Sequence, residues 1–253
     1  MGASLSSPPV RQDIVDGLIP RRHQIQYRSP RIVSLDGNIG AGKSTLLEKL
    51  GTAFPHIKVV HEPVDTWTRL KNAEGRNLLE LFYEDKKRWA YTFQNAAILS
   101  RLKMLKDAIA KALPGQIIIT ERSVLTDRFV FAQMLKDKGD IDPLEWDLYE
   151  MWYNTFASEL PMAGIIYITT GVATSSDRIR LRGRGGEESI PDAYLTDLAE
   201  QHERWLKMVA EQSSSMVAEQ SSDTYLPVLR ISTEISVPIE HTMNQIRGFL
   251  EKL

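Results

Sequence analysis

The sequence predicts an α/β fold in which a mostly parallel sheet is covered by helices on both faces. Short apolar segments that are typical of strands alternate along the chain with longer segments that are typical of helices. This alternation implies parallel strands with helices on both sides of the sheet. A second observation is a glycine-rich loop between the first strand and the first helix, at the edge where open α/β sheets bind their ligands.

The elements can be placed in chain order. The first strand runs from Arg31 to the residue before Gly37, and the first helix begins after the glycine-rich loop and includes Leu50. Further strands are expected at Ile57–His61, Gln116–Thr120, Gly164–Thr169 and Pro227–Ile231. Helices are expected over about Leu78–Leu113, around Asp127–Leu160, through the arginine-rich stretch near residue 180, and at the amphipathic C-terminus.

The composition is that of an ordinary globular chain. Of its 253 residues, 42% are hydrophobic and 25% are charged, so one α/β domain can absorb the length. The net charge of −2 argues against nucleic acid as a partner, because no basic excess is present to neutralise a phosphate backbone. The chain has no cysteine, which excludes disulfides, thiolate metal sites and cysteine nucleophiles. No apolar run has the length of a membrane span, so stable membrane association is not expected.

Residues 1–29 are expected to form a flexible arm ahead of a single domain at 30–253. Prolines, serines and scattered charges interrupt any hydrophobic period in this arm. Its start, MGASLS, fits a short myristoylation pattern, which leaves acylation of Gly2 open. Arginines in the arm suggest an organelle transit peptide, but Asp13 and Asp16 interrupt the acid-poor composition of such peptides. The cytoplasm is therefore the expected location, with the mitochondrion as the alternative.

One segment of the chain is duplicated. Residues 208–214 read MVAEQSS, and residues 216–222 repeat the same letters. Two copies cannot build a solenoid. We interpret the serine-rich segment 208–222 as an enlarged surface loop or helix end, which costs little stability because closure entropy grows slowly with loop length.

The glycine-rich loop predicts binding of a nucleoside triphosphate. It comprises Gly37, Asn38, Ile39, Gly40, Ala41, Gly42, Lys43 and Ser44, followed by Thr45. The glycines let consecutive backbone N–H groups point at phosphate oxygens, Lys43 can reach the β- and γ-phosphates, and the Ser44 hydroxyl can bind Mg²⁺. The N-terminus of the following helix adds a favourable dipole.

Two carboxylates stand at strand ends opposite this loop. Glu62 directly follows the strand Ile57–His61, and Glu121 directly follows the strand Gln116–Thr120. Phosphoryl transfer gives two tasks to carboxylates: one holds Mg²⁺ together with Ser44, and the other accepts the proton of an attacking hydroxyl. The positions alone leave open which glutamate has which task.

One face of the expected helix Leu78–Leu113 predicts a pocket wall. At 3.6 residues per turn, this face collects Tyr83, Ala90, Gln94, Ala97 and Arg101. Small and hydrogen-bonding side chains of this kind are unusual for a stripe that faces solvent. The Gln94 amide can read the hydrogen-bonding edge of a base. Arg101 and Asp127 can pair at the far end of the pocket, or form a purely structural salt bridge.

An arginine cluster predicts a lid at about residues 178–190. Arg178 and Arg182 lie one helical turn apart, and Arg184 follows among glycines. Arginine presents a planar fork that matches phosphate oxygens. In a chain without basic excess, the cluster favours a clamp on a γ-phosphate over a solvated face, and closure of the lid would exclude water.

Together these motifs resemble the deoxynucleoside kinase family, closest to its deoxycytidine and deoxyguanosine kinase branch. The motifs are GNIGAGKST, EPVDTW, LFYEDKKRWAYTFQ, LSR, ERSVLTDRF and RIRLRGRGGEESIP, and the resemblance spans about Arg31–Leu206. It implies a P-loop nucleoside/nucleotide-kinase fold with a five-stranded parallel sheet, helices on both faces and an arginine-rich lid. It further implies a homodimer and ATP-dependent transfer of the γ-phosphoryl group to the 5′-hydroxyl of a deoxynucleoside in nucleotide salvage.

The resemblance also implies roles for the reacting residues. Glu62 would be the base for the 5′-hydroxyl, Arg122 would contact phosphate and substrate beside it, and Lys43 would serve the transferred phosphate. Ser44 and Glu121 would bind Mg²⁺. The lid clamp on ATP would consist of Arg178, Arg182 and Arg184.

For the nucleoside, the resemblance implies a second set of contacts. Tyr83 and Glu187 would hold the sugar 3′-hydroxyl, and Gln94 would read the base. The residues that would pack around the base are Trp67, Phe93 and Phe131. Ala97 together with Arg101 and Asp127 resembles the branch that prefers deoxycytidine, deoxyadenosine or deoxyguanosine over thymidine.

Other interpretations remain open at this stage. A thymidine-type or nucleoside-monophosphate kinase would keep the glycine-rich loop, the lid and the catalytic base. Such an enzyme would either lack the Arg101–Asp127 pair or need a cationic pocket for an acceptor phosphate. A non-catalytic nucleotide-binding switch would have no use for Glu62 or the lid arginines. The stretch Ser232–Ser236 differs from the aspartate-containing stretch that meets adenine in the branch, which leaves the preferred phosphate donor open.

Overall fold

The computed structural model describes residues 29–157, 160–187, 190–218, 226–234 and 238–253. The predicted arm, with Gly2, therefore lies almost entirely outside the described residues. In the described part, five strands form one sheet: β1 (Arg31–Gly37), β2 (Lys58–Val60), β3 (Ile117–Glu121), β4 (Met162–Thr169) and β5 (Val228–Ser232). All neighbouring strands pair in parallel in the order β2-β3-β1-β4-β5, which confirms the predicted parallel sheet.

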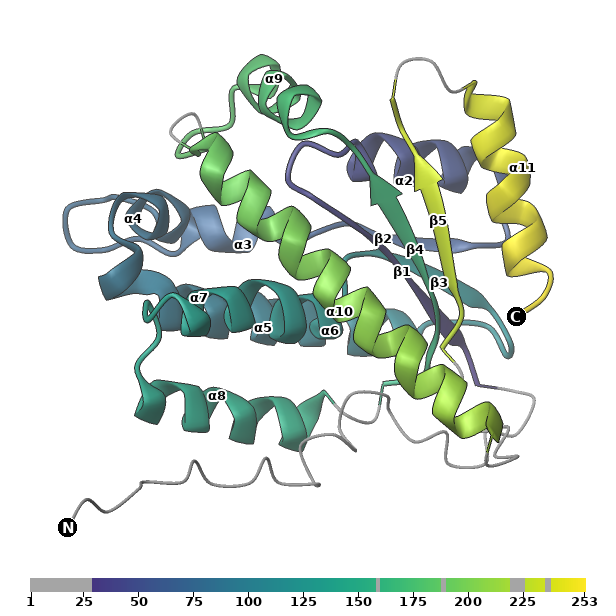
Figure 1. Ribbon diagram of the computed structural model, residues 1–253, viewed down its shortest axis with the longest axis horizontal. Coiled ribbons are helices and arrows are strands. Elements are labelled where there is room, and N and C mark those ends of the chain that lie inside the picture. The colour runs from purple at the N-terminus through teal and green to yellow at the C-terminus, as the bar shows by residue number, and fades with distance from the viewer. Residues whose placement is uncertain (1–28, 158–159, 188–189, 219–225, 235–237) are drawn as a thin grey trace, which may run out of the picture.

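Helices cover both faces of this sheet (Figure 1). They are α2 (Lys43–Ala53), α3 (Val64–Arg69), α4 (Leu78–Glu84), α5 (Lys86–Ala110), α6 (Val124–Thr126), η1 (Asp127–Ala132), α7 (Gln133–Asp137), α8 (Pro143–Phe156), α9 (Val172–Arg182), α10 (Asp192–Ala218) and α11 (Ile239–Leu250). Among the described residues, no helix is long and apolar enough to cross a membrane.

The hydrophobic core lies in two layers because side chains alternate along the buried strands. On β4, Ile165 and Tyr167 point into the layer that contains α5, η1 and α10, whereas Ile166 and Ile168 point into the layer with α2 and α11. A parallel sheet that is covered on both faces needs apolar side chains on both, which explains the nearly unbroken apolar run of this strand.

The predicted helix Leu78–Leu113 is wrong in one respect, because the structure divides it at Asp85. This residue leaves the helical conformation, with φ −137° and ψ 85°, and its side chain accepts a hydrogen bond from the Arg88 N–H at 3.1 Å. Asp85 therefore caps the N-terminus of α5, and this local preference outweighs the helical period. Tyr83 lies on α4 as a consequence, and does not share a helix face with Gln94 or Arg101.

The segment expected to be helical around Asp127–Leu160 contains a turn of π-helix. Residues Asp127–Ala132 form η1, between the short α6 and α7. Helix α8 follows with a capping box made by Asp142 and Glu145, and packs against α5. Single π-helical turns are rare in proteins, and those that occur often lie at functional sites.

The duplicated segment extends α10. Its first copy, residues 208–214, continues this helix, which runs on through Ala218. The rest of the second copy, residues 219–222, lies outside the described residues. The interpretation of the duplication as an enlarged helix end agrees with this part of the structure.

Candidate active site

Two cavities meet at the carboxyl ends of β1, β2 and β3. The inner cavity is lined by Ile39, Gly40, Lys43, Glu62, Trp67, Leu79, Tyr83, Phe93, Gln94, Ala97, Arg101, Glu121, Arg122, Asp127, Phe131, Arg182, Arg184 and Glu187. The loop cavity is lined by Gly40, Gly42, Lys43, Ser44, Thr45, Leu46, Lys49, Glu121, Arg178, Arg182, Ser232, Thr233, Ile239 and Thr242. The two share Gly40, Lys43, Glu121 and Arg182, so a molecule in one cavity would touch a molecule in the other at these residues.

The glycine-rich loop is held in place from two sides. A Cβ atom at Gly40, where φ is +75°, would lie 2.4 Å from the Ser175 carbonyl oxygen, so the loop packs directly on the backbone of α9. On the other side, the Asn38 amide donates to the Leu195 carbonyl of α10 at 2.8 Å. These contacts fix the loop before any phosphate binds.

Lys43 points inward from this loop. Its ammonium is buried and donates to the carbonyl oxygens of Asn38 at 2.7 Å and Gly37 at 3.2 Å. Burial, followed by the positive charge of Arg122, lowers the pKa of Lys43 to about 7. An anion beside this ammonium would stabilise its protonated form, which is the response expected of a phosphate-binding lysine.

Ser44 and Glu121 meet at the junction of the cavities. The Ser44 hydroxyl donates to Glu121 Oε1 at 2.9 Å. No group of three or more His, Asp or Glu side chains in the described part of the chain could hold a metal ion by itself. A hydroxyl and one carboxylate suit Mg²⁺ instead, because this cation usually completes its shell with phosphate oxygens and water.

Glu62 has a different environment. Its Oε1 accepts hydrogen bonds from Arg122 at 2.6 Å and from Arg101 at 3.1 Å. Burial alone would raise its pKa, but the two guanidinium groups lower the pKa of Glu62 to about 2. The carboxylate is therefore ionised at neutral pH. Both arginine bonds use Oε1, so Oε2 is not engaged by either arginine, and Glu62 lines the inner cavity.

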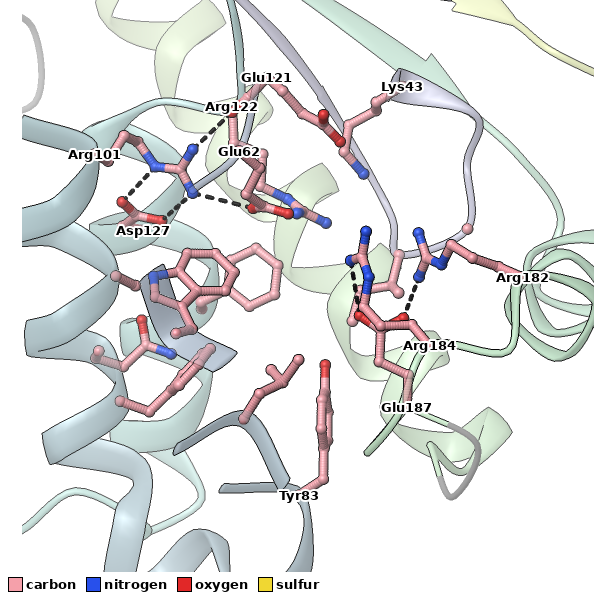
Figure 2. Close-up of a pocket in the computed structure, with 18 residues that line it drawn as sticks. Lys43, Glu62, Tyr83, Arg101, Glu121, Arg122, Asp127, Arg182, Arg184 and Glu187 are labelled. Carbon is pink, nitrogen blue, oxygen red and sulfur yellow. Dashed lines mark hydrogen bonds and ion pairs between the residues drawn. The ribbon is translucent and has the colours of Figure 1, made fainter. Parts of the chain in front are cut away.

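Arg101 and Asp127 form the pair that the sequence suggested. Arg101 Nε donates to Asp127 Oδ2 at 2.8 Å, and a terminal nitrogen donates to Oδ1 at 3.2 Å. The same guanidinium donates to the Glu121 carbonyl at 2.6 Å and to Glu62. Arg101 thus links the carboxylates of Asp127 and Glu62 (Figure 2).

Arg122 is held in an unusual backbone conformation. Among the described residues it is the one non-glycine with positive φ, at +59°. Its guanidinium lies 4.8 Å from the centre of the Phe131 ring, and it donates to Glu62. A strained residue with a buried charge at a cavity junction is typical of a functional site.

Aromatic rings and one amide form the wall of the inner cavity. Trp67 packs edge-on against Phe93 with ring centres 5.3 Å apart, and the Trp67 N–H donates to Ser100 at 3.0 Å. Gln94 and Ala97 are buried on α5, and Tyr83 reaches the same cavity from α4. Of the five residues predicted to form the pocket wall, Tyr83 lines the cavity from α4 and Gln94, Ala97 and Arg101 line it from α5, whereas Ala90 is buried and does not line it.

The lid arginines divide between the cavities. Arg178 lines only the loop cavity, where it donates to the carbonyl oxygens of Thr233 at 2.8 Å and Ala41 at 3.3 Å. Arg184 lines only the inner cavity, and Arg182 lines both. Arg182 and Arg184 both bind Glu187, which lies on the side of the inner cavity opposite Arg101 and Asp127 (Figure 2).

Two further groups of polar residues lie in or near the cavities. Ser232 and Thr233 follow β5 into the loop cavity, and the Thr233 hydroxyl donates to Ala41 O at 2.9 Å. Both belong to the stretch Ser232–Ser236, which the resemblance had linked to the phosphate donor. Asp36, which was not identified from the sequence, lines neither cavity but is buried near the end of β1, where it accepts hydrogen bonds from Ser34 and Thr126. Burial raises the pKa of Asp36.

Comparisons with known proteins agree with this geometry. The sequence pattern described as deoxynucleoside kinase matches residues 33–246. Deoxycytidine kinase 2 of Gallus gallus is 35% identical over 242 residues, which cover 87% of this chain and 90% of the relative. Deoxycytidine kinase of Homo sapiens is 36% identical over 198 residues, 69% of this chain and 74% of the relative. The mitochondrial deoxyguanosine kinase of Xenopus laevis is 31% identical over 220 residues, 80% of this chain and 82% of the relative. This chain belongs to the deoxynucleoside kinase family, and is thus a phosphate-transferring enzyme for which ATP is the implied donor.

Proposed function

We propose that this enzyme transfers the γ-phosphoryl group of ATP to the 5′-hydroxyl of a deoxynucleoside in the presence of Mg²⁺. The observation that carries the proposal is the junction of the two cavities at Lys43, Glu121 and Arg182. A triphosphate on the glycine-rich loop would bring its terminal phosphate to this junction, and a nucleoside in the inner cavity would bring its hydroxyl. Alignment of the two reactants supplies much of the catalysis of phosphoryl transfer.

Glu62 is the proposed base. Its ionised carboxylate lies beside the junction, and its Oε2 atom is available to the 5′-hydroxyl because the two arginines bind Oε1. Arg122 would hold this carboxylate in place and stabilise charge on the transferred phosphate. Lys43 and the lid arginines would add positive charge at the phosphate oxygens.

Ser44 and Glu121 are the proposed ligands of Mg²⁺. When bound, the cation would neutralise charge on the phosphates. The assignment follows from the 2.9 Å bond between the two side chains, since Glu62 is already occupied by arginines.

Deoxycytidine, deoxyadenosine and deoxyguanosine are the proposed substrates. The side-chain amide of Gln94 is buried and has no hydrogen-bond partner among the described residues, so it is free to bind a base edge. The Arg101–Asp127 pair adds charged donors and acceptors at the same end. The names of the relatives, deoxycytidine and deoxyguanosine kinases, support this choice. Tyr83 and Glu187 would hold the 3′-hydroxyl, with Trp67, Phe93 and Phe131 around the base.

A homodimer is the proposed assembly. Helix α8 exposes several large apolar side chains, namely Leu144, Leu148, Met151, Trp152 and Phe156, and α5, against which it packs, exposes Leu99. Large exposed apolar patches mark interaction surfaces. Light scattering after gel filtration should give the mass of a dimer, and Met151→Asp should give a monomer. Leu113→Asp, at an equally exposed site away from α8, is the matched control and should leave the dimer intact.

The proposed location is the cytoplasm. One relative is named as mitochondrial, so imaging of the full chain with a C-terminal fluorescent protein distinguishes the two compartments.

Analysis of the product tests the proposed reaction. The enzyme is incubated with ATP, MgCl₂ and deoxycytidine, and ³¹P and ¹H NMR then identify the esterified hydroxyl. The expected product is deoxycytidine 5′-monophosphate, and 2′,5′-dideoxycytidine, which lacks the acceptor hydroxyl, should give none. A phosphate ester at the 3′ position, or no ester with any deoxynucleoside, would contradict the proposal.

A further inference from the structure

Glu187 binds both lid arginines that face the inner cavity. Arg184 donates to Oε1 at 3.1 Å, and Arg182 donates to Oε2. The carboxylate is almost fully buried, with a side-chain exposure of 6%, while each arginine is about one-third exposed. Each oxygen of Glu187 is therefore occupied by a guanidinium group.

The lid is closed around this cluster. A Cβ atom at Gly186 would lie 3.2 Å from Glu80 Cα, so the loop after α9 lies directly against the N-terminal turn of α4. Tyr83, which lines the same end of the cavity, is carried by α4 as well. The Glu187 carboxylate thus lies between the two arginines, in the position that a bound anion would take.

Carboxylate and phosphate compete for the same arginine geometry. A guanidinium fork binds either group through two parallel N–H bonds. Arg182 lines the loop cavity as well as the inner cavity, so a phosphate on the glycine-rich loop can attract it away from Glu187. Each oxygen of Glu187 already accepts a bond from a guanidinium group, so Glu187 is a weaker acceptor for a neutral hydroxyl than it becomes when Arg182 leaves Oε2.

We propose that Glu187 is an exchange residue that couples the two substrates: phosphate on the glycine-rich loop takes Arg182 from Glu187 Oε2, and this oxygen then accepts a hydrogen bond from the sugar 3′-hydroxyl. The inference rests on the proposed function, in which a nucleoside occupies the inner cavity and ATP the loop cavity. Coupling of this kind is reciprocal, so each ligand tightens the binding of the other by the same factor.

The sugar hydroxyl provides the test. Isothermal titration calorimetry measures the Kd of deoxycytidine and of 2′,3′-dideoxycytidine, each with and without saturating Mg²⁺ and the non-hydrolysable analogue AMP-PNP. Without AMP-PNP, the two nucleosides should bind about equally, because Glu187 is occupied. With AMP-PNP, deoxycytidine should bind about fivefold tighter or more, whereas the affinity for dideoxycytidine should stay nearly constant. An equal gain for both nucleosides would overturn the proposal.

Two substitutions locate the effect. Glu187→Gln keeps the shape but removes the charge, so AMP-PNP alone should bind more tightly, and the advantage of deoxycytidine over dideoxycytidine should be lost. Glu187→Asp retains the charge and should retain part of the coupling. Coupling of full size in Glu187→Gln would assign the effect to other residues.

The proposed function can be judged separately from this inference. If the wild-type enzyme produced deoxycytidine 5′-monophosphate but showed the same AMP-PNP effect for both nucleosides, only the exchange at Glu187 would be wrong. If it neither bound nor phosphorylated deoxynucleosides, the proposed function would fail first.

Discussion

At the scale of single residues, Glu62 and Glu121 are distinguished by their partners. Glu62 lies between two guanidinium groups, and Glu121 accepts a bond from the Ser44 hydroxyl at the loop. The two guanidinium groups keep the Glu62 carboxylate ionised and correctly oriented. The Glu121 carboxylate remains free to share a cation with phosphate oxygens. The sequence placed both glutamates at strand ends but could not separate their roles from position alone.

Removal of the proposed base should stop chemistry without preventing donor binding. In Glu62→Gln we expect kcat to fall by about 10²–10⁴-fold, the usual range for a general base. The Kd of AMP-PNP should change little, because Glu62 does not line the loop cavity. The matched variant Glu121→Gln should instead raise the Mg²⁺ concentration needed for half-maximal rate. Near-normal turnover of Glu62→Gln, measured by steady-state kinetics, would contradict the assignment of the base.

The Arg101–Asp127 pair should determine which nucleobase the enzyme prefers in its substrate. We expect Arg101→Met with Asp127→Ala to raise the ratio of kcat/KM for thymidine over deoxycytidine by about tenfold, since polar discrimination in a pocket is of this order or larger. Absolute rates should fall for every nucleoside, because Arg101 also binds Glu62.

The same two changes at an exposed pair provide the control for this prediction. Glu200→Ala with Arg204→Met removes a surface pair on α10 and should leave the ratio unchanged. An unchanged ratio in the Arg101–Asp127 variant as well would show that other residues select the base.

At the scale of elements, the strongest sequence signals were those tied to local geometry. The glycine-rich loop between β1 and α2 follows from its glycines and Lys43, and the apolar runs of β1 and β4 follow from burial on both faces. The break at Asp85 was not predicted, because the helical period continues across it while the cap that ends it depends on one side chain. The π-helical turn at Asp127–Ala132 gives no periodic signal in so short a segment.

The contact between the lid and α4 should control closure. Gly186 has φ +87° and lies against Glu80, so Gly186→Ala adds backbone strain of about 1–2 kcal/mol and a crowded Cβ. We expect higher KM values for both substrates and a lower kcat, together with a loss of about 1–2 kcal/mol in the free energy of unfolding from the backbone strain. Gly183→Ala is the matched control, because φ there is +59° but nothing lies within 4 Å of the added Cβ.

This comparison isolates the contact from the strain. If Gly186→Ala affected KM no more than Gly183→Ala did, packing of the lid on α4 would not contribute to closure. Steady-state kinetics with each substrate varied in turn, together with urea unfolding, measure both quantities.

At the scale of the whole molecule, the sheet order brings distant segments to one site. Strands β2, β3 and β1 are neighbours, which places Glu62, Glu121 and the glycine-rich loop side by side. The rule that parallel sheets bind ligands at their carboxyl ends predicted this meeting. The binding of Arg182 and Arg184 by Glu187 could not be predicted, because it depends on how the segment after α9 folds back over the inner cavity.

The stability of the molecule should depend on pH through His202. Burial lowers the pKa of His202 to about 3, against an ordinary value of about 6.5 in the unfolded chain. Below pH 6.5 the unfolded chain therefore binds a proton that the native protein does not, and stability falls as pH decreases toward 3. Between pH 7 and pH 5, this residue alone should cost about 2 kcal/mol.

Urea unfolding at the two pH values measures this contribution. Between pH 7 and pH 5, the free energy of unfolding of His202→Phe should fall by about 2 kcal/mol less than that of the wild type. His241→Phe, at an exposed site on α11, should show the same pH dependence as the wild type. An identical loss in wild type and His202→Phe would show that His202 is not buried in its neutral form.

The central claim is that the inner cavity accepts a deoxynucleoside of the cytosine or purine type. The most direct test is kcat/KM with ATP and Mg²⁺ for deoxycytidine, deoxyadenosine, deoxyguanosine, thymidine and deoxycytidine monophosphate. We predict that deoxycytidine or a purine deoxynucleoside has the highest value and that the monophosphate is not turned over. A preference for thymidine would contradict the role given to Arg101 and Asp127, and turnover of the monophosphate alone would contradict the proposed reaction.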